Sequence, residues 1–278
     1  MSLQIKIYDV NHGNAIHVKT PNDKDVMIDC GSNSSTGFSP SKHISGQQRS
    51  IDYLIVSHPH CDHISDIENF VGCHHPQILQ RPEVSIEEIL EANQSYCEDI
   101  IETYYEFQKS YNSPLEEGES PKNPEWGGGA KFINYSLEGE TNLNNASKVS
   151  FLSYLNFTIL FPGDIEESGW KKLLGMGYFK EWLKKTDILV ASHHGRESGY
   201  CNEIFEYLNP YLTIVSDGRF SDTSATNRYS AKSLGWKIWN SDGEGIERKV
   251  LTTRYDGDID IGVGKKQNGK TYISVSIT

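Results

Sequence analysis

The sequence predicts an α/β fold for this chain of 278 residues. Short apolar runs at 51–56 and 157–161 are typical of strands buried on both faces. Helical signals stand between such runs, and the clearest begins with Ser85 and Glu88, which form a capping signal. Strand signals extend over the whole length, which favours a single domain covering residues 1–278.

The first 60 residues contain several alternating or fully apolar runs, of which 3–7 and 51–56 are the clearest strand candidates. A Ser- and Gly-rich loop at 31–50 precedes the second run. We expect this loop to lie over the functional site.

The run at 51–56 is followed at once by three histidines and an aspartate within residues 58–63. In an extended segment His58 and His60 project to the same side and can share one ion. Asp62 and His63 follow where the chain turns and can reach a second ion. Mixed imidazole and carboxylate ligands favour two zinc ions, with manganese or iron as alternatives. The competing interpretation is a solvated histidine-rich turn.

Residues 72–140 are expected to form a helical and loop insertion, with one helix over about 85–110 and a Pro/Gly-rich stretch at 113–130. Aromatic side chains gather in this segment. They could stack on a ligand, or the helix could bury them against its own domain, which is the commoner situation. These aromatic residues are Tyr96, Tyr104, Tyr105, Phe107, Tyr111 and Trp126.

Two later strands also end in candidate ligands. Residues 157–161 lead into Asp164, although a Pro-Gly-Asp triplet can simply form a turn that ends a strand. Residues 188–191 lead to His193 and His194, and Gly195 then allows the backbone to bend close to a ligand. We expect one histidine of this pair to bind metal and the other to face the substrate or act as an acid. Sequence alone leaves their assignment open.

Arg196 and Ser198 follow the histidine pair and are candidate substrate contacts, because arginine pairs bidentately with phosphate and a hydroxyl can donate to a phosphoryl oxygen. The alternative is a solvated loop. His12, in the first loop, is a further candidate for lining the site.

These motifs resemble those of the metallo-β-lactamase fold superfamily. The His-x-His-x-Asp-His pattern at 58–63 is its signature, and four further segments match it in order between residues 5 and about 200. The resemblance implies a four-layer αββα sandwich with the metal centre at one edge. It also implies that Asp164 bridges two metals. The matching segments are 9–15, 27–31, 160–164 and 188–195.

Within that superfamily the chain is similar to the ComEC-type hydrolase domain and to phosphorylcholine esterases, through residues 9–14, Asn145, Ser147 and the endings at 163–164 and 193–195. Many members have a third histidine for the first metal near the place of Asn145. The departure implies a weakly held first ion or help from another residue such as His12.

The resemblance implies a metal-dependent hydrolase, specifically a phosphodiesterase or nuclease-type enzyme that uses a hydroxide held between the metals. Three alternatives remain: a carboxyl-ester, lactone or thioester hydrolase on the same centre, a di-iron oxidoreductase, and a non-enzymatic scaffold. The expected catalytic residues are Asp62, His193 and His194, and the expected substrate-binding residues are His12, Asn145, Ser147, Arg196 and Ser198. The expected metal ligands are His58, His60, Asp62, His63, Asp164, His193 and His194.

Composition limits the partners. A net charge of −12 works against binding an extended duplex and is compatible with a small phosphodiester or with a nucleic-acid end. No apolar stretch approaches the roughly 20 residues needed to span a bilayer, so no membrane is expected. Five cysteines, an odd number without a Cys-x-x-Cys pair, favour reduced thiols and a cytoplasmic location. Oligomeric state is left open.

Overall fold

The computed structural model describes residues 2–218 and 223–278. In these residues the strands form two sheets, one of nine and one of six strands. The larger sheet contains the N-terminal and C-terminal strands side by side, since β1 pairs with β14 over its whole length. In spatial order its strands are β12 (Gly245–Arg248), β11 (Trp236–Trp239), β15 (Thr271–Ile277), β14 (Ile259–Lys265), β1 (Ser2–Ile7), β2 (Ala15–Lys19), β3 (Asp25–Cys30), β4 (Tyr53–Ile55) and β5 (Ile78–Gln80).

The smaller sheet comes from the second half of the chain. Its middle strands run parallel, β8 beside β9 and β9 beside β10, whereas β6, β7 and β8 form an antiparallel meander. In spatial order its strands are β13 (Val250–Thr252), β10 (Leu212–Val215), β9 (Ile188–Val190), β8 (Phe157–Phe161), β7 (Val149–Tyr154) and β6 (Lys131–Tyr135).

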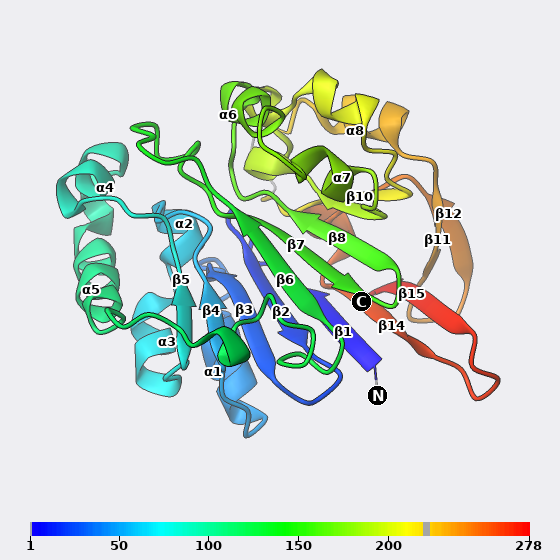
Figure 1. Cartoon of the computed structure of the whole chain (residues 1–278), viewed down its shortest axis with the longest axis horizontal. Coiled ribbons are helices and arrows are strands. Elements are labelled where there is room, and N and C mark those ends of the chain that lie inside the picture. The colour runs from blue at the N-terminus through cyan, green and yellow to red at the C-terminus, as the bar shows by residue number, and fades with distance from the viewer. Residues whose placement is uncertain (1, 219–222) are drawn as a thin grey trace.

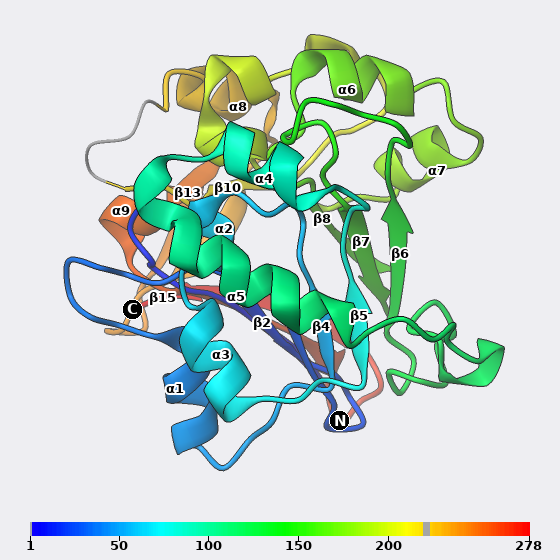
Figure 2. The ribbon, with the colours of Figure 1, turned by 90° about the vertical axis from the view of Figure 1, so that its left-hand side faces the viewer.

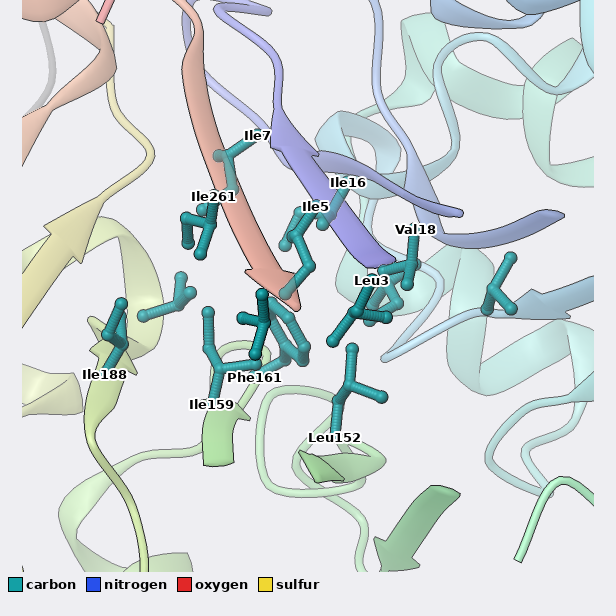
Figure 3. Packing of buried hydrophobic residues seen from close by; sticks show 14 of the residues in the cluster. Leu3, Ile5, Ile7, Ile16, Val18, Leu152, Ile159, Phe161, Ile188 and Ile261 are labelled. Carbon is teal, nitrogen blue, oxygen red and sulfur yellow. The ribbon is translucent and has the colours of Figure 1, made fainter. Parts of the chain in front are cut away.

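A hydrophobic core lies between the two sheets. Figure 3 shows Leu3, Ile5 and Ile261 of the larger sheet facing Ile159 and Phe161 of the smaller one. These side chains are almost completely buried. Each sheet buries alternate residues on this inner face, and its outer face needs a second cover.

Helices supply that cover and complete four layers. On the outer face of the smaller sheet, α6 (Glu167–Leu173), α7 (Phe179–Leu183) and α8 (Thr226–Lys232) pack over a second apolar cluster. On the larger sheet, α1 (Pro40–Gly46), α3 (Ile67–Cys73) and α5 (Glu98–Lys109) pack over a third. Figure 1 shows these two groups of helices on different flanks of the paired sheets. The predicted αββα architecture is confirmed.

The segment at 72–140 contains helices and also the edge strands β5 and β6 of the two sheets. In Figure 2, α5 crosses in front of β4, and α4 (Ile86–Ala92) packs beside α5. The predicted capping box at Ser85 is present. The expectation of one helix over 85–110 was wrong, because Asn93 is extended and a short 3₁₀ turn at Ser95–Cys97 separates α4 from α5.

The aromatic side chains of this segment pack mainly against the domain, as the commoner interpretation predicted: two of the six are buried and three are half-buried. Tyr104 of α5 is fully buried against the larger sheet's helical cover, and Trp126 packs edge-to-face on Tyr53 in the core between the sheets. Tyr96 differs, because 79% of its surface is exposed.

The cysteine interpretation needs a correction. Cys61 and Cys97 form a disulfide, with their Cα atoms 6.0 Å apart, whereas Cys30, Cys73 and Cys201 are free thiols. The partners are 36 positions apart in the sequence, which hid the pair, since only folding brings the 3₁₀ turn at Ser95–Cys97 against α2 (Cys61–Ile64). Cysteine usage therefore no longer argues for a cytoplasmic location. Among the helices of the described residues, none combines the length and the apolar character that a membrane span requires.

Strand direction places the functional residues. The parallel strands β3 and β4 end together, and so do β8, β9 and β10 in the other sheet. Asp29 lies in the last residues of β3, and the chain continues from the ends of β4, β8 and β9 to His58, Asp164 and His193. Ligand sites in α/β sheets commonly form at such carboxyl ends.

Candidate metal centre

Four predicted ligands converge at the edge of the sandwich. Nε2 of His194 lies 3.2 Å from Oδ2 of Asp62 and 3.4 Å from Oδ2 of Asp164. Nε2 of His63 lies 3.2 Å from Oδ1 of Asp164 and 3.2 Å from Nε2 of His194. Asp164 therefore lies between residues that come from both sheets.

His58 and His60 lie beside this group. Nε2 of His58 is 2.8 Å from Nδ1 of His60 and 3.9 Å from Oδ2 of Asp164. Nε2 of His193 lies 3.8 Å from the same carboxylate oxygen. Within the described residues, two clusters have ligand atoms close enough together to hold a metal ion: His58, His63 and Asp164, and His12, Asp62 and His194.

The turn after β9 has an uncommon backbone. His193 and His194 have φ of 50° and 52°, and Gly195 follows with φ of 77°. Residues with a side chain rarely adopt this left-handed region, and they tend to do so at functional sites. At Gly195 an added Cβ would lie 2.9 Å from a side-chain atom of Val215, so this position needs glycine for its space as well as its conformation. The predicted bend at Gly195 is confirmed.

Asp29 anchors the loop that carries the histidine motif, residues 57–63, which we call the histidine loop. This fully buried carboxylate accepts hydrogen bonds from the Ser57 backbone N–H at 2.6 Å, from the Ser57 hydroxyl at 2.8 Å and from the Asn14 amide at 2.9 Å. Nδ1 of His63 lies 2.8 Å from its Oδ2. Asp29 belongs to the segment 27–31 that carries the superfamily resemblance, whereas nothing in the sequence marked Ser57.

Close backbone approach brings the first loop against the histidine loop. A Cβ at Gly13 would lie 2.4 Å from the carbonyl oxygen of Asp62, and one at Gly31 would lie 2.6 Å from the same oxygen. The two glycines thus permit a contact that positions His12. Nε2 of His12 lies 3.3 Å from Oδ2 of Asp62, and its ring centroid lies 4.6 Å from that of His194.

Burial and neighbouring histidines shift the pKa values of the two carboxyl groups at the centre in opposite directions. Burial alone would raise the pKa of Asp62, but His63 and His194 hold that pKa well below its ordinary value. Burial likewise opposes the ionised form of Asp164, yet His194 and His63 keep its pKa low. Both carboxylates are therefore ionised and available to a cation.

The histidines divide into two groups by charge. Burial lowers the pKa of His58, His60 and His193, which favours neutral imidazoles. Burial would also lower the pKa of His63 and His194, but the surrounding carboxylates raise both pKa values above the ordinary one. In the absence of another cation, protons on these two rings balance the buried carboxylates.

A cleft of about 750 Å³ opens onto this cluster. Asp62, Asp164 and His193 line it together with Arg196. The expectation of a loop over all of 31–50 was wrong, because residues 40–46 form α1, but the part before that helix contributes Ser32 and Ser34 to the cleft. The insertion contributes residues 92–94, 96–97 and 100. The charged groups in the cleft are thus accompanied by neutral side chains, both polar and apolar.

Arg196 and Ser198 contact His193. An N–H of Arg196 lies 3.1 Å from Nε2 of His193, and a second guanidinium nitrogen lies 3.5 Å from Nε2 of His12. The hydroxyl of Ser198 lies 2.9 Å from Nδ1 of His193. Arg196 is in the cleft, whereas Ser198 is placed to orient the histidine.

Asn145 and Ser147 support the loop that carries Asp164. The Asn145 amide donates to Ser168 at 3.0 Å and accepts the backbone N–H of Glu166 at 3.0 Å. The Ser147 hydroxyl accepts the backbone N–H of Asp164 at 3.1 Å. Substrate contacts by Asn145 and Ser147 stay predictions, and the hydrogen bonds in the structure give both residues a positioning role.

Comparison with known proteins supports one superfamily. Residues 8–80 match the family model described as Metallo-beta-lactamase superfamily. This range contains the loop with His12, the strand that carries Asp29 and the complete histidine motif. No curated protein matches the chain.

Solved structures of several enzymes are similar at low identity. Igni18, a metallo hydrolase from Ignicoccus hospitalis, is 11% identical, with 97% of this chain and 98% of that chain covered and a TM-score of 0.46. The diiron β-hydroxylase CmlA from Streptomyces venezuelae is 12% identical, with 76% and 44% covered and a TM-score of 0.44. A long form RNase Z from yeast is 11% identical, with 81% and 39% covered and a TM-score of 0.40. None of these likenesses assigns a reaction to this chain.

Proposed function

We propose that this chain is a metal-dependent hydrolase of the metallo-β-lactamase superfamily that cleaves small phosphodiesters. The observation that carries the proposal is the convergence of Asp62, His63, Asp164 and His194 within 4.0 Å at the base of a cleft that also contains Arg196. The superfamily match over residues 8–80 supports the hydrolase class. The phosphodiester substrate is inferred from the cleft.

The donor set fits divalent cations. Two imidazole nitrogens, of His63 and His194, lie 3.2 Å apart and face the same carboxylate of Asp164. Such an arrangement needs a positive charge at its centre, which protons or metal ions can supply. Imidazole and carboxylate donors suit zinc best, and manganese and iron also accept them. Bound ions of this kind lower the pKa of water and neutralise charge that develops on phosphoryl oxygens.

The two adjacent histidines receive different roles. Nδ1 of His194 donates to the carbonyl oxygen of Ser216 at 2.7 Å, which directs its Nε2 lone pair toward Asp62 and Asp164. His194 is therefore the proposed ligand. His193 contacts Arg196 and lines the cleft, so it is proposed to contact the substrate.

Arg196 is the proposed phosphate contact. Its guanidinium lies in the cleft, within hydrogen-bonding reach of two imidazoles, and guanidinium groups bind phosphate oxygens in a bidentate manner. The net charge of −12 supports a compact substrate over an extended duplex, because a broad basic surface is what duplex binding requires. A free small phosphodiester and the end of a nucleic-acid strand both meet this condition.

The experiment compares substrate classes on zinc- and manganese-loaded protein. We expect hydrolysis of bis-p-nitrophenyl phosphate and little hydrolysis of p-nitrophenyl acetate or a lactone. Arg196→Gln should reduce kcat/KM for the phosphodiester by about 10- to 100-fold, the loss typical of one charged contact to phosphate. Arg228→Gln is the matched control, since Arg228 is exposed and pairs with Glu197 outside the cleft lining. Preferential cleavage of the acetate or lactone would instead assign the centre to carboxyl esters.

A further inference from the structure

The insertion supplies a wall of the cleft, formed by residues 93–97. Asn93, Gln94, Tyr96 and Cys97 all line the same cavity as Asp62. This wall is the break between α4 and α5, where the chain leaves helical geometry. A helix interrupted at this point presents side chains to the cleft that a continuous helix over 85–110 would direct elsewhere.

Three bonds attach the wall to the histidine loop. The disulfide joins Cys97 to Cys61, which lies between His60 and Asp62 in the sequence. The Asn93 side chain accepts the backbone N–H of Cys61 at 2.8 Å and donates to the carbonyl oxygen of Pro59 at 3.2 Å. The wall is therefore held at a fixed distance from the ligands.

Tyr96 is the tyrosine of the insertion that lines this cleft. Its side chain is 79% exposed although it lines the cleft, whereas Tyr104 is fully buried and Phe107 packs against the same core. The other residues of the wall are neutral. An exposed phenol ring beside neutral amides suits a planar, uncharged group, because stacking needs a π face and no charge.

We propose that the wall at 93–97 selects the ester group that stays on phosphorus, through stacking of a planar aromatic group on Tyr96. The Cys61–Cys97 disulfide and Asn93 are positioning elements that fix the distance between that ring and the metal ligands. This inference rests on the proposed phosphodiesterase function. An aryl ester and a nucleobase share the relevant chemistry, so substrates of both kinds belong in the test.

The first experiment measures KM for two substrates with the same leaving group. Bis-p-nitrophenyl phosphate keeps an aryl ester on phosphorus, and methyl p-nitrophenyl phosphate keeps a methyl group. Tyr96→Ala should raise KM about tenfold for the first substrate, with less than about a twofold change for the second, and Tyr96→Phe should restore the wild-type value. Tyr255→Ala is the control, since Tyr255 is equally exposed but does not line the cleft. Equal changes for both substrates would overturn the proposal.

Thymidine 5′-p-nitrophenyl phosphate extends the comparison to a nucleobase. A KM below that of the methyl ester, lost in Tyr96→Ala, supports selection through the base. A KM that Tyr96→Ala leaves unchanged for both the aryl and the nucleoside ester contradicts the role of the ring.

Binding provides a readout independent of turnover. Calorimetry with phenylphosphonate and methylphosphonate on metal-loaded protein should show tighter binding of the phenyl compound, and Tyr96→Ala should remove the difference. If wild type hydrolyses no phosphodiester yet binds the phenyl compound more tightly, the proposed reaction is wrong and the proposed stacking on Tyr96 is supported. If hydrolysis occurs without tighter binding of the phenyl compound, the proposed stacking on Tyr96 is wrong and the proposed reaction is supported.

The attachment of the wall to the histidine loop through the Cys61–Cys97 disulfide is tested with cysteine variants. Alkylation of unfolded, unreduced protein should label three thiols, and alkylation after reduction should label five, as the disulfide requires. The double variant Cys61→Ser with Cys97→Ser should show faster hydrogen exchange at 93–100 and a weaker phenyl preference. A double change of Cys30→Ser with Cys73→Ser is the control. Five labelled thiols without reduction, or an unchanged exchange rate, would contradict this attachment.

Discussion

Nδ1 of His63 lies 2.8 Å from Oδ2 of Asp29, and both side chains are almost fully buried. The contact fixes the ring so that Nε2 faces Asp164 at 3.2 Å. Ser57 and Asn14 donate to the same Asp29 carboxylate, so its own orientation is fixed as well. A residue that contacts no substrate thus determines the direction of a proposed ligand.

Asp29→Asn is therefore expected to weaken metal binding while the fold persists. An amide cannot accept all of the hydrogen bonds that the carboxylate accepts, and loss of such a supporting partner typically costs about 10- to 100-fold in metal affinity. Competition with a chromogenic chelator measures the affinity. Asp66→Asn is the matched control, because Asp66 is equally buried but bonds Ser39 and the Ser41 backbone. Equal losses in both variants would show a general effect of removing a buried carboxylate.

Substitutions of the adjacent residues His193 and His194 should have different effects. His194→Gln is expected to lower metal content, because Nε2 of His194 faces two carboxylates. His193→Gln is expected to retain the metal and reduce turnover, since His193 contacts Arg196 in the cleft. Elemental analysis and hydrolysis assays on both proteins distinguish these effects. The opposite pattern, with metal lost only in His193→Gln, would exchange the two roles.

Gly31→Ala should destabilise the site loops without a change in chemical groups. The new Cβ would lie 2.6 Å from the Asp62 carbonyl oxygen and 2.9 Å from that of Asn14, so backbone must move. Overpacking of this kind costs about 1–3 kcal/mol in the free energy of unfolding. Urea denaturation measures it, and Gly46→Ala, which has open space around its Cβ, is the control. A Gly31 variant as stable as wild type would contradict the close contact.

His74 gives the fold a pH dependence away from the cleft. Burial lowers its pKa, and its Nε2 lies 3.0 Å from the Ser41 carbonyl oxygen, so the folded state holds a neutral ring. Below pH 6.5 the His74 imidazole binds a proton in the unfolded chain but stays neutral in the folded chain. The free energy of unfolding therefore falls as pH falls. The contribution changes by at most about 1.4 kcal/mol per pH unit.

Comparison with His74→Gln isolates this effect. The difference in unfolding free energy between wild type and variant, in chelator-treated protein, should shrink between pH 7.5 and pH 5.5. Because the histidines of the cleft are present in both proteins, their titration cancels. A difference that stays constant over this range would show that His74 is not held neutral.

The sequence predicted features that depend on local pattern. The strand ending before His58, the capping box at Ser85 and the bend at Gly195 each follow from a few neighbouring residues. The four layers followed from the resemblance, and Figure 1 shows them. The convergence of Asp164 and His194 with the histidine loop could be anticipated because all three segments end strands.

Features that depend on distant contacts were not predictable in the same way. The Cys61–Cys97 pair and the break at Asn93 depend on where the insertion packs, which no short pattern encodes. Asn145 and Ser147 carried polar atoms of the right kind near the motif, but folding directs those atoms to the loop of Asp164. Polar residue type alone does not distinguish a substrate contact from a support.

The most direct test of the central claim is metal content measured together with phosphodiester hydrolysis in wild type, Asp164→Ala and the exposed control Asp242→Ala. We expect wild type and Asp242→Ala to bind about two equivalents of metal and to hydrolyse bis-p-nitrophenyl phosphate, as a two-metal site would. Asp164→Ala should lose both properties, since Asp164 lies between His63 and His194. Wild type that binds no zinc or manganese and shows no turnover would contradict the account and support a scaffold that kept the fold.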